Sequence, residues 1–380
     1  MAKILKALVV GAGFGGLTVA TALAQRGWQV AVNERQAELR ASGSGIYIWE
    51  NGLRILAALG ARVVQEGAFQ GRAMEQRDHL NQVIDAGDFP PNVRLITVPR
   101  RDLLEGLRDA ALRAGVRIHT AAEVVGASAD GELSFVNGAT ERADLLIGAD
   151  GVWSTVRRSL GLELIHEQTR EGALRAIIPG SQEELGVDGQ GKYIECWSGE
   201  RRLLITPLTQ SQIYLAFTCQ RGDRVGCAVP LDKAAWTTSF PAWAHLIDRV
   251  ETLLPWSSYS IVKVKSWSAG RAAIIGDAAH AQPPNLGQGG GMAMQNGLAL
   301  AVFMEGLNDP REIPQRLWAW ESSQRELAEH SQRWSCLYGE VSVLPDPVRA
   351  KVIYQGMSDP WLRSQLLRVA QSQPLGTVAP

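Results

Sequence analysis

The sequence predicts an α/β protein, in which a Rossmann-like domain carries an inserted antiparallel sheet and a helical C-terminal tail. Three observations lead to this class. Glycine-rich turns follow short apolar runs near the N-terminus and near the C-terminal third of the chain, a pattern typical of a strand, a turn and a helix in nucleotide-binding folds. Segments that alternate apolar and polar residues, such as 193–197, 202–206 and 212–217, predict antiparallel strands. The segment 331–380 has the pattern of helices interrupted by prolines.

The first glycine-rich turn lies close to the N-terminus. Residues 4–10 form an apolar strand candidate, and Gly-Ala-Gly-Phe-Gly-Gly over 11–16 opens a helix over 17–26. The glycines allow a tight bend, close approach of the backbone to a pyrophosphate, and close packing of helix on strand. A second strand over 27–32 leads to Glu34, whose carboxylate is placed to accept the hydroxyls of an adenosine ribose. A turn that binds nothing does not account for Glu34. The predicted dinucleotide contacts are Gly11, Gly13, Phe14, Gly15, Gly16, Glu34 and Arg35.

A later segment places an acidic residue between an apolar strand and a second glycine-rich turn. The run 272–276 delivers Asp277 to the end of a predicted strand. A Pro-Pro corner and the turn 287–291 then open a helix that we expect to begin near Met292. A carboxylate in this position can accept a sugar hydroxyl, while free N–H groups and the helix dipole face phosphate. Another predicted strand ends in Asp150-Gly151, which alone is an ordinary turn dipeptide.

These turns together resemble a known family. The segments 11–16, 148–157 (Gly-Ala-Asp-Gly-Val-Trp-Ser-Thr-Val-Arg) and 276–280 (Gly-Asp-Ala-Ala-His) are similar, in order and spacing, to the motifs of the single-component FAD-dependent aromatic hydroxylases. That family includes the hydroxybenzoate, salicylate and hydroxypyridine-carboxylate oxygenases, and the segment 41–56 resembles the hydroxypyridine-carboxylate branch. The resemblance implies FAD as the cofactor and NADH or NADPH as a transient reductant.

The resemblance also implies a fold and an activity. We expect a glutathione-reductase-like FAD-binding domain, a substrate-binding sheet domain that closes a pocket at the domain boundary, and C-terminal helices. The implied activity is NAD(P)H- and O₂-dependent oxygenation of a small hydroxylated aromatic or pyridine carboxylate through a flavin C4a-hydroperoxide. The alternatives are a ring-opening oxygenase of a hydroxypyridine carboxylate and a non-catalytic flavin-binding redox module. The expected segments are 1–72, 98–170 and 263–330 for the FAD-binding domain, 73–97 and 171–262 for the sheet domain, and 331–380 for the C-terminal helices.

Residue by residue, the resemblance carries functional roles onto this chain. Arg202 would bind a carboxylate with its planar fork, and Tyr214 would hydrogen-bond a ring hydroxyl or nitrogen. The alternatives are a solvent-facing arginine and a tyrosine that only packs. Met74 stands where the hydroxypyridine-carboxylate branch has a pocket tyrosine, and His280 is expected to support its turn rather than act as a base. The predicted catalytic residues are Tyr47, Arg175, Arg202 and Tyr214, which line the substrate pocket, and Pro284, which shapes the pocket wall beside the flavin ring. The further cofactor contacts are Gly45, Arg100, Val124, Asp150, Asp277, Gly287, Gln288, Gly289 and Gly290.

The composition of the chain argues against several classes of binding partner. With 38 basic and 39 acidic residues, the chain is unsuited to nucleic acid or an anionic membrane as its main partner. Its four cysteines lack metal-binding spacing, and we expect reduced thiols in a cytoplasmic protein without a metal site. No run approaches the ~20 apolar residues that span a bilayer, so no stable membrane association is expected. The expected partners are a small aromatic acid and O₂, and the expected assembly is a monomer or a homodimer.

Overall fold

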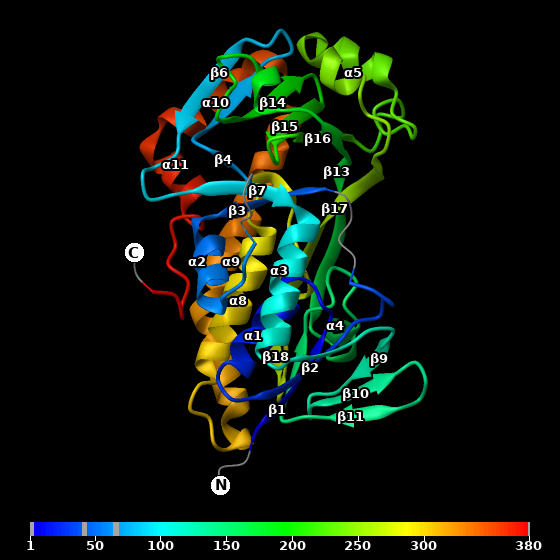
Figure 1. Ribbon diagram of the computed structural model, residues 1–380, viewed down its shortest axis with the longest axis vertical. Coiled ribbons are helices and arrows are strands. Elements are labelled where there is room, and N and C mark those ends of the chain that lie inside the picture. Colours follow the sequence, from blue (N-terminus) through cyan, green and yellow to red (C-terminus); the bar gives the residue numbers. More distant parts are fainter. Residues whose placement is uncertain (1–3, 40–43, 64–67, 379–380) are drawn as a thin grey trace.

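The computed structural model describes residues 4–39, 44–63 and 68–378, which form two parts stacked along the long axis of the molecule (Figure 1). The lower part holds a mostly parallel sheet beside long helices, and the upper part holds a large mixed sheet. The segment 41–56 resembles the hydroxypyridine-carboxylate branch, and its first three residues lie outside the described residues.

The sheet of the lower part runs in the order β18-β19-β12-β1-β2-β8. Its neighbours are parallel except β18 with β19. Consecutive residues Ala7 to Val10 are all buried, so both faces of this sheet are covered, which explains the unbroken apolar runs in its strands. The strands are β1 (Lys6–Val10), β2 (Gln29–Asn33), β8 (Arg117–His119), β12 (Leu145–Gly148), β18 (Ser268–Ala269) and β19 (Ala272–Ile274).

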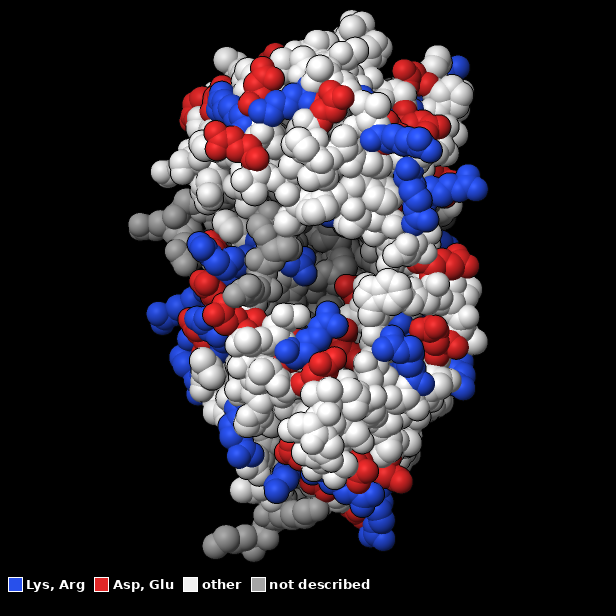
Figure 2. All heavy atoms as spheres, turned by 90° about the vertical axis from the view of Figure 1, so that its right-hand side faces the viewer, with Lys and Arg blue, Asp and Glu red and all other residues white. Residues whose placement is uncertain are grey.

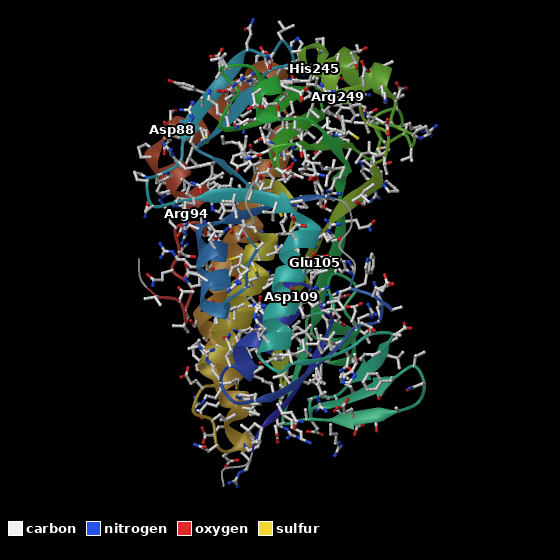
Figure 3. All side chains as sticks on the ribbon, viewed as in Figure 1. Asp88, Arg94, Glu105, Asp109, His245 and Arg249 are labelled. Carbon is white, nitrogen blue, oxygen red and sulfur yellow. The ribbon has the colours of Figure 1, made fainter. Side chains whose placement is uncertain are left out.

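Helices pack beside this sheet, and α1 contacts both α3 and α8. Charged side chains such as Glu105 and Asp109 extend from the outer face of α3 (Figure 3), while Leu103, Leu104 and Leu107 on its other face are buried. This amphipathic pattern holds α3 against the domain. The helices of the lower part are α1 (Phe14–Ala24), α2 (Glu50–Leu59), α3 (Arg100–Arg113), α4 (Thr155–Ser159), α7 (Asp277–His280) and α8 (Gly289–Phe303).

Two helix starts differ from the prediction. The N–H of Leu17 donates to the Gly13 carbonyl at 2.9 Å, and the N–H of Met292 donates to the Gln288 carbonyl at 2.8 Å. The first turns of α1 and α8 therefore close inside the glycine-rich segments, and the predicted starts at Leu17 and Met292 are wrong by one turn. Both glycine-rich turns consequently end in helix N-termini.

The upper sheet runs in the order β17-β13-β16-β15-β14-β5-β6. It was predicted to be antiparallel, but β14 pairs with β5 in parallel, because these strands come from separate segments and no hairpin joins them. The predicted boundary at residue 171 falls inside β13, which bends through register shifts along β17. The strands are β5 (Ala73–Arg77), β6 (Val83–Asp88), β13 (Glu163–Pro179), β14 (Lys192–Ser198), β15 (Arg201–Pro207), β16 (Gln212–Gln220) and β17 (Leu254–Val264).

Smaller elements complete the two parts. A sheet in the order β3-β7-β4 lies between them, and a sheet in the order β11-β10-β9 lies at the edge of the lower part (Figure 1). Short helices α5 (Lys233–Ser239) and α6 (Ala244–Ile247) bury Trp236 and Leu246 against the upper sheet. The small strands are β3 (Gly45–Trp49), β4 (Phe69–Gly71), β7 (Leu95–Pro99), β9 (Val124–Ala127), β10 (Glu132–Phe135) and β11 (Thr140–Arg142).

The C-terminal segment is helical, and its longest helix spans both parts. α9 (Ile313–Glu340) runs without a break through the predicted boundary at 330, since no proline or glycine occurs in its middle. α10 (Asp346–Ser358) and α11 (Pro360–Leu367) follow, each with a proline in its first turn. In the described part of the chain, no helix has the length and apolar character to cross a membrane.

Candidate active site

A cavity of about 650 Å³ separates the two parts of the molecule, and the face that it hollows is visible in Figure 2. Its lower wall contains the turns after β1 and β19 and the N-terminus of α8. Strands β3 and β13–β17 form the upper wall, and α10 and α11 contribute to the far end. The two glycine-rich segments therefore meet at one cavity although they lie far apart in the sequence.

Two glycines of the first turn have no room for a side chain. Gly11 has a φ of +97°, and a Cβ there would lie 2.4 Å from the Ala149 carbonyl oxygen. A Cβ at Gly16 would lie 2.0 Å from the Gly11 carbonyl oxygen. At Gly13, by contrast, no described atom lies within 4 Å of such a Cβ, because Gly13 faces the cavity. The turn is thus tightly packed on the protein side and open toward a ligand.

Glu34 follows β2 and stands beside this turn. Its carboxylate accepts the N–H of Ala12 at 2.9 Å and the N–H of Gln36 at 3.0 Å. A second cavity of about 140 Å³, lined by Glu34, Gly13, Phe14 and Arg100 among others, adjoins it. Arg35 is exposed and Val124 is buried in β9, and neither is among the described residues that line the two cavities. Arg35 directly follows Glu34, and Ala122, two residues before Val124, donates to the Glu34 carbonyl at 2.9 Å, so both predicted contacts lie near Glu34 without lining either described cavity.

Two opposite charges face the main cavity from separate elements. Arg100 begins α3 and lies over the Phe14 ring at 4.6 Å, and Asp277 begins α7. Both side chains are exposed to the cavity yet surrounded by protein. Burial raises the pKa of Asp277, and the charge of Arg100 opposes that rise. Burial correspondingly lowers the pKa of Arg100, and Asp277 opposes that fall.

The N-terminus of α8 forms the floor of the cavity. Gly287 has a φ of +63°, and Gly289 and Gly290 line the cavity beside it. Among the described residues no side chain caps this helix, so its first N–H groups and its dipole are available to an anion or a polarised oxygen. Pro284 also lines the cavity, whereas Gln288 is buried beneath it.

Asp150 serves the turn after β12. It accepts hydrogen bonds from the Ser154 hydroxyl at 2.5 Å and from the N–H of Val156 at 3.1 Å. Its neighbours Ala149 and Gly151 line the cavity, and Asp150 itself is not among the described lining residues. The Asp150 carboxylate, which was predicted to contact the cofactor, therefore stabilises the turn after β12. Unlike Glu34 and Asp277, Asp150 does not line either described cavity.

The predicted substrate residues Tyr47, Arg175 and Tyr214 meet on the upper wall. The Tyr47 hydroxyl contacts the Thr206 hydroxyl, and burial raises the pKa of Tyr47. Burial also raises the pKa of Tyr214, while the nearby charges of Arg175 and Arg100 oppose the rise. Among the described residues, no carboxylate forms an ion pair with Arg175 or Arg100. Asp277 attracts Arg100 only over a longer distance. The part of the cavity around Arg175 and Arg100 therefore carries two positive charges. Gly45 also lines the cavity, and a Cβ there would lie 2.6 Å from the Leu208 side chain and 2.9 Å from the Tyr214 ring.

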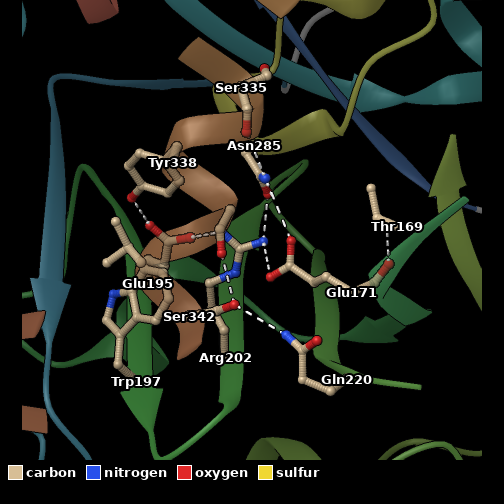
Figure 4. Close-up of polar contacts among 12 residues, drawn as sticks. Thr169, Glu171, Glu195, Trp197, Arg202, Gln220, Asn285, Ser335, Tyr338 and Ser342 are labelled. Atoms are coloured by element: carbon tan, nitrogen blue, oxygen red, sulfur yellow. Dashed lines mark hydrogen bonds and ion pairs between the residues drawn. The ribbon is translucent and has the colours of Figure 1, made fainter. Parts of the chain in front are cut away.

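Arg202 lines the cavity but is occupied by protein carboxylates. Its guanidinium lies 3.3 Å from Glu171 and 3.1 Å from Glu195, and it donates to Asn285 at 2.6 Å (Figure 4). Burial lowers the pKa of Arg202, but the two carboxylates outweigh it and leave the pKa raised. These ion pairs run against the predicted role of Arg202 as a ligand for a substrate carboxylate. The guanidinium N–H groups that would bind a substrate carboxylate already contact protein acceptors.

Several lining residues were not foreseen. Glu195 interrupts the apolar segment 193–197, and this charge in a buried strand was the signal that could have identified it. Tyr338, Met357 and Leu367 come from the C-terminal helices, where nothing in the local pattern distinguishes them from packing residues. Met74, noted as a departure from the hydroxypyridine-carboxylate branch, does line the cavity.

His280 is buried beside the cavity. Its Nε2 lies 2.6 Å from the Asn296 side-chain nitrogen, and its ring lies 5.3 Å from Trp267. Burial lowers the pKa of His280 to about 4, so the ring is neutral at pH 7. The side chain is 4% exposed, and the described cavity lining does not include it. The contacts of His280 join α7 to α8.

Comparisons with known proteins agree with this geometry. A model of the FAD binding domain matches residues 5–328. A 2-heptyl-3-hydroxy-4(1H)-quinolone synthase of Mycobacteroides abscessus is 37% identical over 95% of this chain and 97% of its own length. A Rhodococcus erythropolis protein provisionally named for the same activity is 38% identical over 97% of this chain and 96% of its own length. The tetrameric form of 2-methyl-3-hydroxypyridine-5-carboxylic acid oxygenase superimposes with a TM-score of 0.87 at 33% identity, covering 99% of this chain and 98% of that one.

The fold and the cavity thus define a flavoprotein oxidoreductase. The chain belongs to the FAD-dependent aromatic hydroxylase family. It is an enzyme and its cofactor is FAD. The glycine turn open at Gly13, the carboxylate of Glu34 and the uncapped N-terminus of α8 fit this cofactor, because it carries a pyrophosphate, a ribose and a polar ring edge.

Proposed function

We propose that this enzyme uses NAD(P)H and O₂ to hydroxylate a ring carbon of a neutral, alkylated N-heteroaromatic compound of the 2-alkyl-4(1H)-quinolone class. The family membership supports the reaction type, and two relatives at 37% and 38% identity are named for a 2-heptyl-quinolone product. The observation that carries the substrate class is the apolar far end of the cavity.

The far end of the cavity is lined mainly by large apolar side chains, together with Arg363 of α11, whose guanidinium donates to the Asp88 carbonyl. Met74 and Phe89 contribute from the β5–β6 region, and Met357, Leu366 and Leu367 contribute from α10 and α11. Burying each methylene of an alkyl chain in such a lining is worth about 0.8 kcal/mol, so a heptyl chain gains far more here than a small acid would. The Arg202 guanidinium, which was predicted to bind a substrate carboxylate, is already paired with Glu171 and Glu195.

The remaining cavity residues have roles that follow from their chemistry. Glu34 would accept ribose hydroxyls, and the N-termini of α1 and α8 would face the pyrophosphate and the flavin ring. Bound FAD supplies the activation of O₂ that ring oxygenation requires. Arg175 and Tyr214 would hold the ring oxygen of the substrate and thereby orient the ring. The enclosing upper sheet excludes water.

A second substrate class is favoured by a different observation. Arg100 and Arg175 face the cavity without an ion-pair partner among the described residues, and a hydroxypyridine or hydroxybenzene carboxylate would supply one. The 33% identical structure is named for a hydroxypyridine carboxylic acid. Either hydroxylation or ring opening would then be the outcome, and the mass of the product distinguishes them.

The test is substrate-stimulated oxidation of NADH or NADPH by the FAD-loaded protein. The compounds are 2-heptyl-4(1H)-quinolone, 6-hydroxynicotinate and 4-hydroxybenzoate, with ¹⁸O₂ to follow oxygen into the product. We expect strong stimulation by the quinolone alone, with one labelled oxygen on its ring. Stimulation only by the acids would replace the first proposal with the second.

A variant pair locates the alkyl chain. Leu367→Trp fills the apolar end of the cavity, and we expect kcat/KM for the heptyl compound to fall by about tenfold or more while a methyl analogue is used as before. Leu337→Trp, at an exposed position of α9, is the matched control and leaves both substrates unchanged. Equal loss for both chain lengths would contradict the placement of the chain.

A further inference from the structure

We propose that Glu195 recognises a ring N–H of the substrate, and that the cluster Glu171–Arg202–Glu195 thereby selects neutral N–H heteroaromatics and rejects carboxylates. This inference rests on the proposed function, since it names the group by which that site would choose its substrate. It assigns Glu195 as a specificity-determining residue and Arg202 as the residue that positions it.

The cluster forms where strands of the upper sheet meet α9. Glu171 comes from β13, Glu195 from β14 and Arg202 from β15, and their side chains converge in Figure 4. All three side chains are at most 8% exposed. Asn285, in the turn beside the N-terminus of α8, accepts from Arg202 at 2.6 Å and donates to the Ser335 carbonyl at 3.0 Å. The cluster therefore ties the upper sheet to the floor of the cavity.

The charges of the cluster do not balance. Two carboxylates share a single guanidinium, so the ionised cluster keeps an excess negative charge in a buried place. Burial raises the pKa of Glu171, and Arg202 opposes that rise. Whether Glu171 is charged or protonated, the cluster offers no free positive charge to a ligand. A carboxylate placed here would face Glu195 at short range.

Glu195 has one acceptor position to spare. Three donors reach its carboxylate among the residues that the structure describes: Arg202 at 3.1 Å on Oε1, and Gln76 at 2.7 Å together with the Tyr338 hydroxyl on Oε2. A carboxylate accepts about four hydrogen bonds, so the lone pair left on Oε1 can take one more. Glu195 lines the cavity, as do Gln76, Arg202 and Tyr338, whereas Glu171 is not among the lining residues described.

The other groups around the cluster do not supply a cation. They are neutral side chains or are already paired, and Tyr259 separates the cluster from Arg175, whose guanidinium lies 5.7 Å from the Tyr259 ring. The described groups that face the cluster, element by element, are Gln76 of β5, Glu171 of β13, Glu195 and Trp197 of β14, Arg202 of β15, Tyr259 of β17, Asn285 beside α8, Tyr338 of α9 and Ser342 just after α9.

The cavity thus presents an acceptor from the cluster and donors from Arg175 and Tyr214. A 4(1H)-quinolone carries the complementary pair, a ring N–H donor and a carbonyl acceptor on opposite sides of one ring. A hydrogen bond from that N–H to the Glu195 carboxylate is charge-assisted and roughly twice as strong as a neutral one. It would also enrich the ring with electrons, which favours attack by carbon on an electrophilic oxygen.

The test compares how tightly a set of ligands binds the FAD-loaded protein in the absence of reductant. Binding is monitored through the change in flavin absorbance. The ligands are 2-heptyl-4(1H)-quinolone, its N-methyl counterpart and 4-hydroxyquinoline-2-carboxylate. Because a hydrogen bond to a charged group is worth about tenfold to a hundredfold in affinity, we expect the N–H compound to bind more tightly than the N-methyl compound by that factor.

In Glu195→Gln we expect this preference to fall by about tenfold, because the acceptor loses its charge. The carboxylate ligand should bind the same variant about tenfold more tightly than it binds the wild type. A variant that merely loosened the fold would weaken both ligands. Glu171→Gln, in the same cluster but outside the described lining, should keep the N–H preference. Glu50→Gln, a buried glutamate paired with Arg54 and Arg94 elsewhere, should change neither ligand.

Glu195→Asp serves if Glu195→Gln does not retain FAD, since it withdraws the charge by one methylene and should also lower the preference. An unchanged preference in both Glu195 variants would overturn the inference, and so would tighter wild-type binding of the carboxylate than of the quinolone or a lack of quinolone binding. Normal discrimination in binding without any turnover would overturn the proposed function and leave the assignment of Glu195 supported.

Discussion

Replacing two glycines of the first turn should separate the folding of this protein from its binding of FAD. Gly16 and Gly13 are three residues apart, but a methyl group added at each meets different surroundings. At Gly16 the Cβ would lie 2.0 Å from the Gly11 carbonyl oxygen and 3.2 Å from the Ala149 Cβ. A close carbon–oxygen contact is about 3.3 Å, so backbone must move by about 1 Å. No side-chain rotation can relieve a contact between two backbone segments.

The magnitude for Gly16→Ala follows from this overlap. Inserting a methyl group into a packed core costs about 1–3 kcal/mol, and the upper end applies because α1 is also held by α3 and α8. We therefore expect the free energy of unfolding of the FAD-free protein to fall by about 3 kcal/mol. FAD affinity should fall as well, because the N-terminus of α1 moves with the turn.

Gly13→Ala should behave in the opposite way. Gly13 has φ −77° and ψ −176°, which alanine adopts without strain, and its Cβ would meet no described atom within 4 Å. The FAD-free protein should keep its stability to within about 0.5 kcal/mol. The methyl group would however occupy the space where the pyrophosphate approaches the backbone. We expect FAD affinity to fall by at least about tenfold, or about 1.4 kcal/mol.

Urea denaturation of the FAD-free proteins and titration with FAD, followed by flavin fluorescence, measure both quantities. The reasoning requires the two variants to differ in which quantity they change. It is refuted if Gly16→Ala unfolds at the wild-type urea concentration, or if Gly13→Ala binds FAD with wild-type affinity.

Two further predictions concern acid and base groups. Glu34→Ala removes the acceptor of the Ala12 and Gln36 N–H groups and the predicted ribose ligand, so FAD affinity should fall by about tenfold while exposed Glu305→Ala leaves it unchanged; equal affinities in a FAD titration would contradict this. The pKa of His280 is about 4 in the folded protein and 6.5 when unfolded, so the unfolded chain binds the extra proton between these values. The stability contributed by neutral His280 is therefore complete above pH 6.5 and declines by about 1.4 kcal/mol per pH unit as the pH falls toward 4. Denaturation curves of His280→Gln should lack this slope, and a slope identical to wild type would exclude His280 as its source.

Much of the cofactor half was predictable because its signals are local. The positions of Gly11 and Gly16 follow from steric demands within one turn, and Glu34 follows from the length of the strand before it. Arg35 directly follows Glu34 and Val124 is buried in β9, but neither lines the described cavities, and their contact with the cofactor stays a prediction.

The substrate half depended on long-range pairing. Arg202 looked like a free carboxylate ligand because its strand gives no hint of its partners. Glu171 reaches it from a neighbouring part of the sheet, and Tyr338 reaches Glu195 from α9, 143 residues further along the chain. A buried charge needs an ion-pair or hydrogen-bond partner, and the tertiary fold decides which residue supplies it.

The amino-acid sequence by itself determined the family, the cofactor and the turns that suit it, since backbone sterics and strand length act over a few residues. Only the tertiary structure decided which charges stay free in the cavity. The fold pairs Arg202 with two carboxylates and leaves Arg175 without an ion pair to a described carboxylate. It also places α10 and α11 at the far end of the cavity. These outcomes depend on contacts between distant segments, whose energies no short stretch of sequence contains.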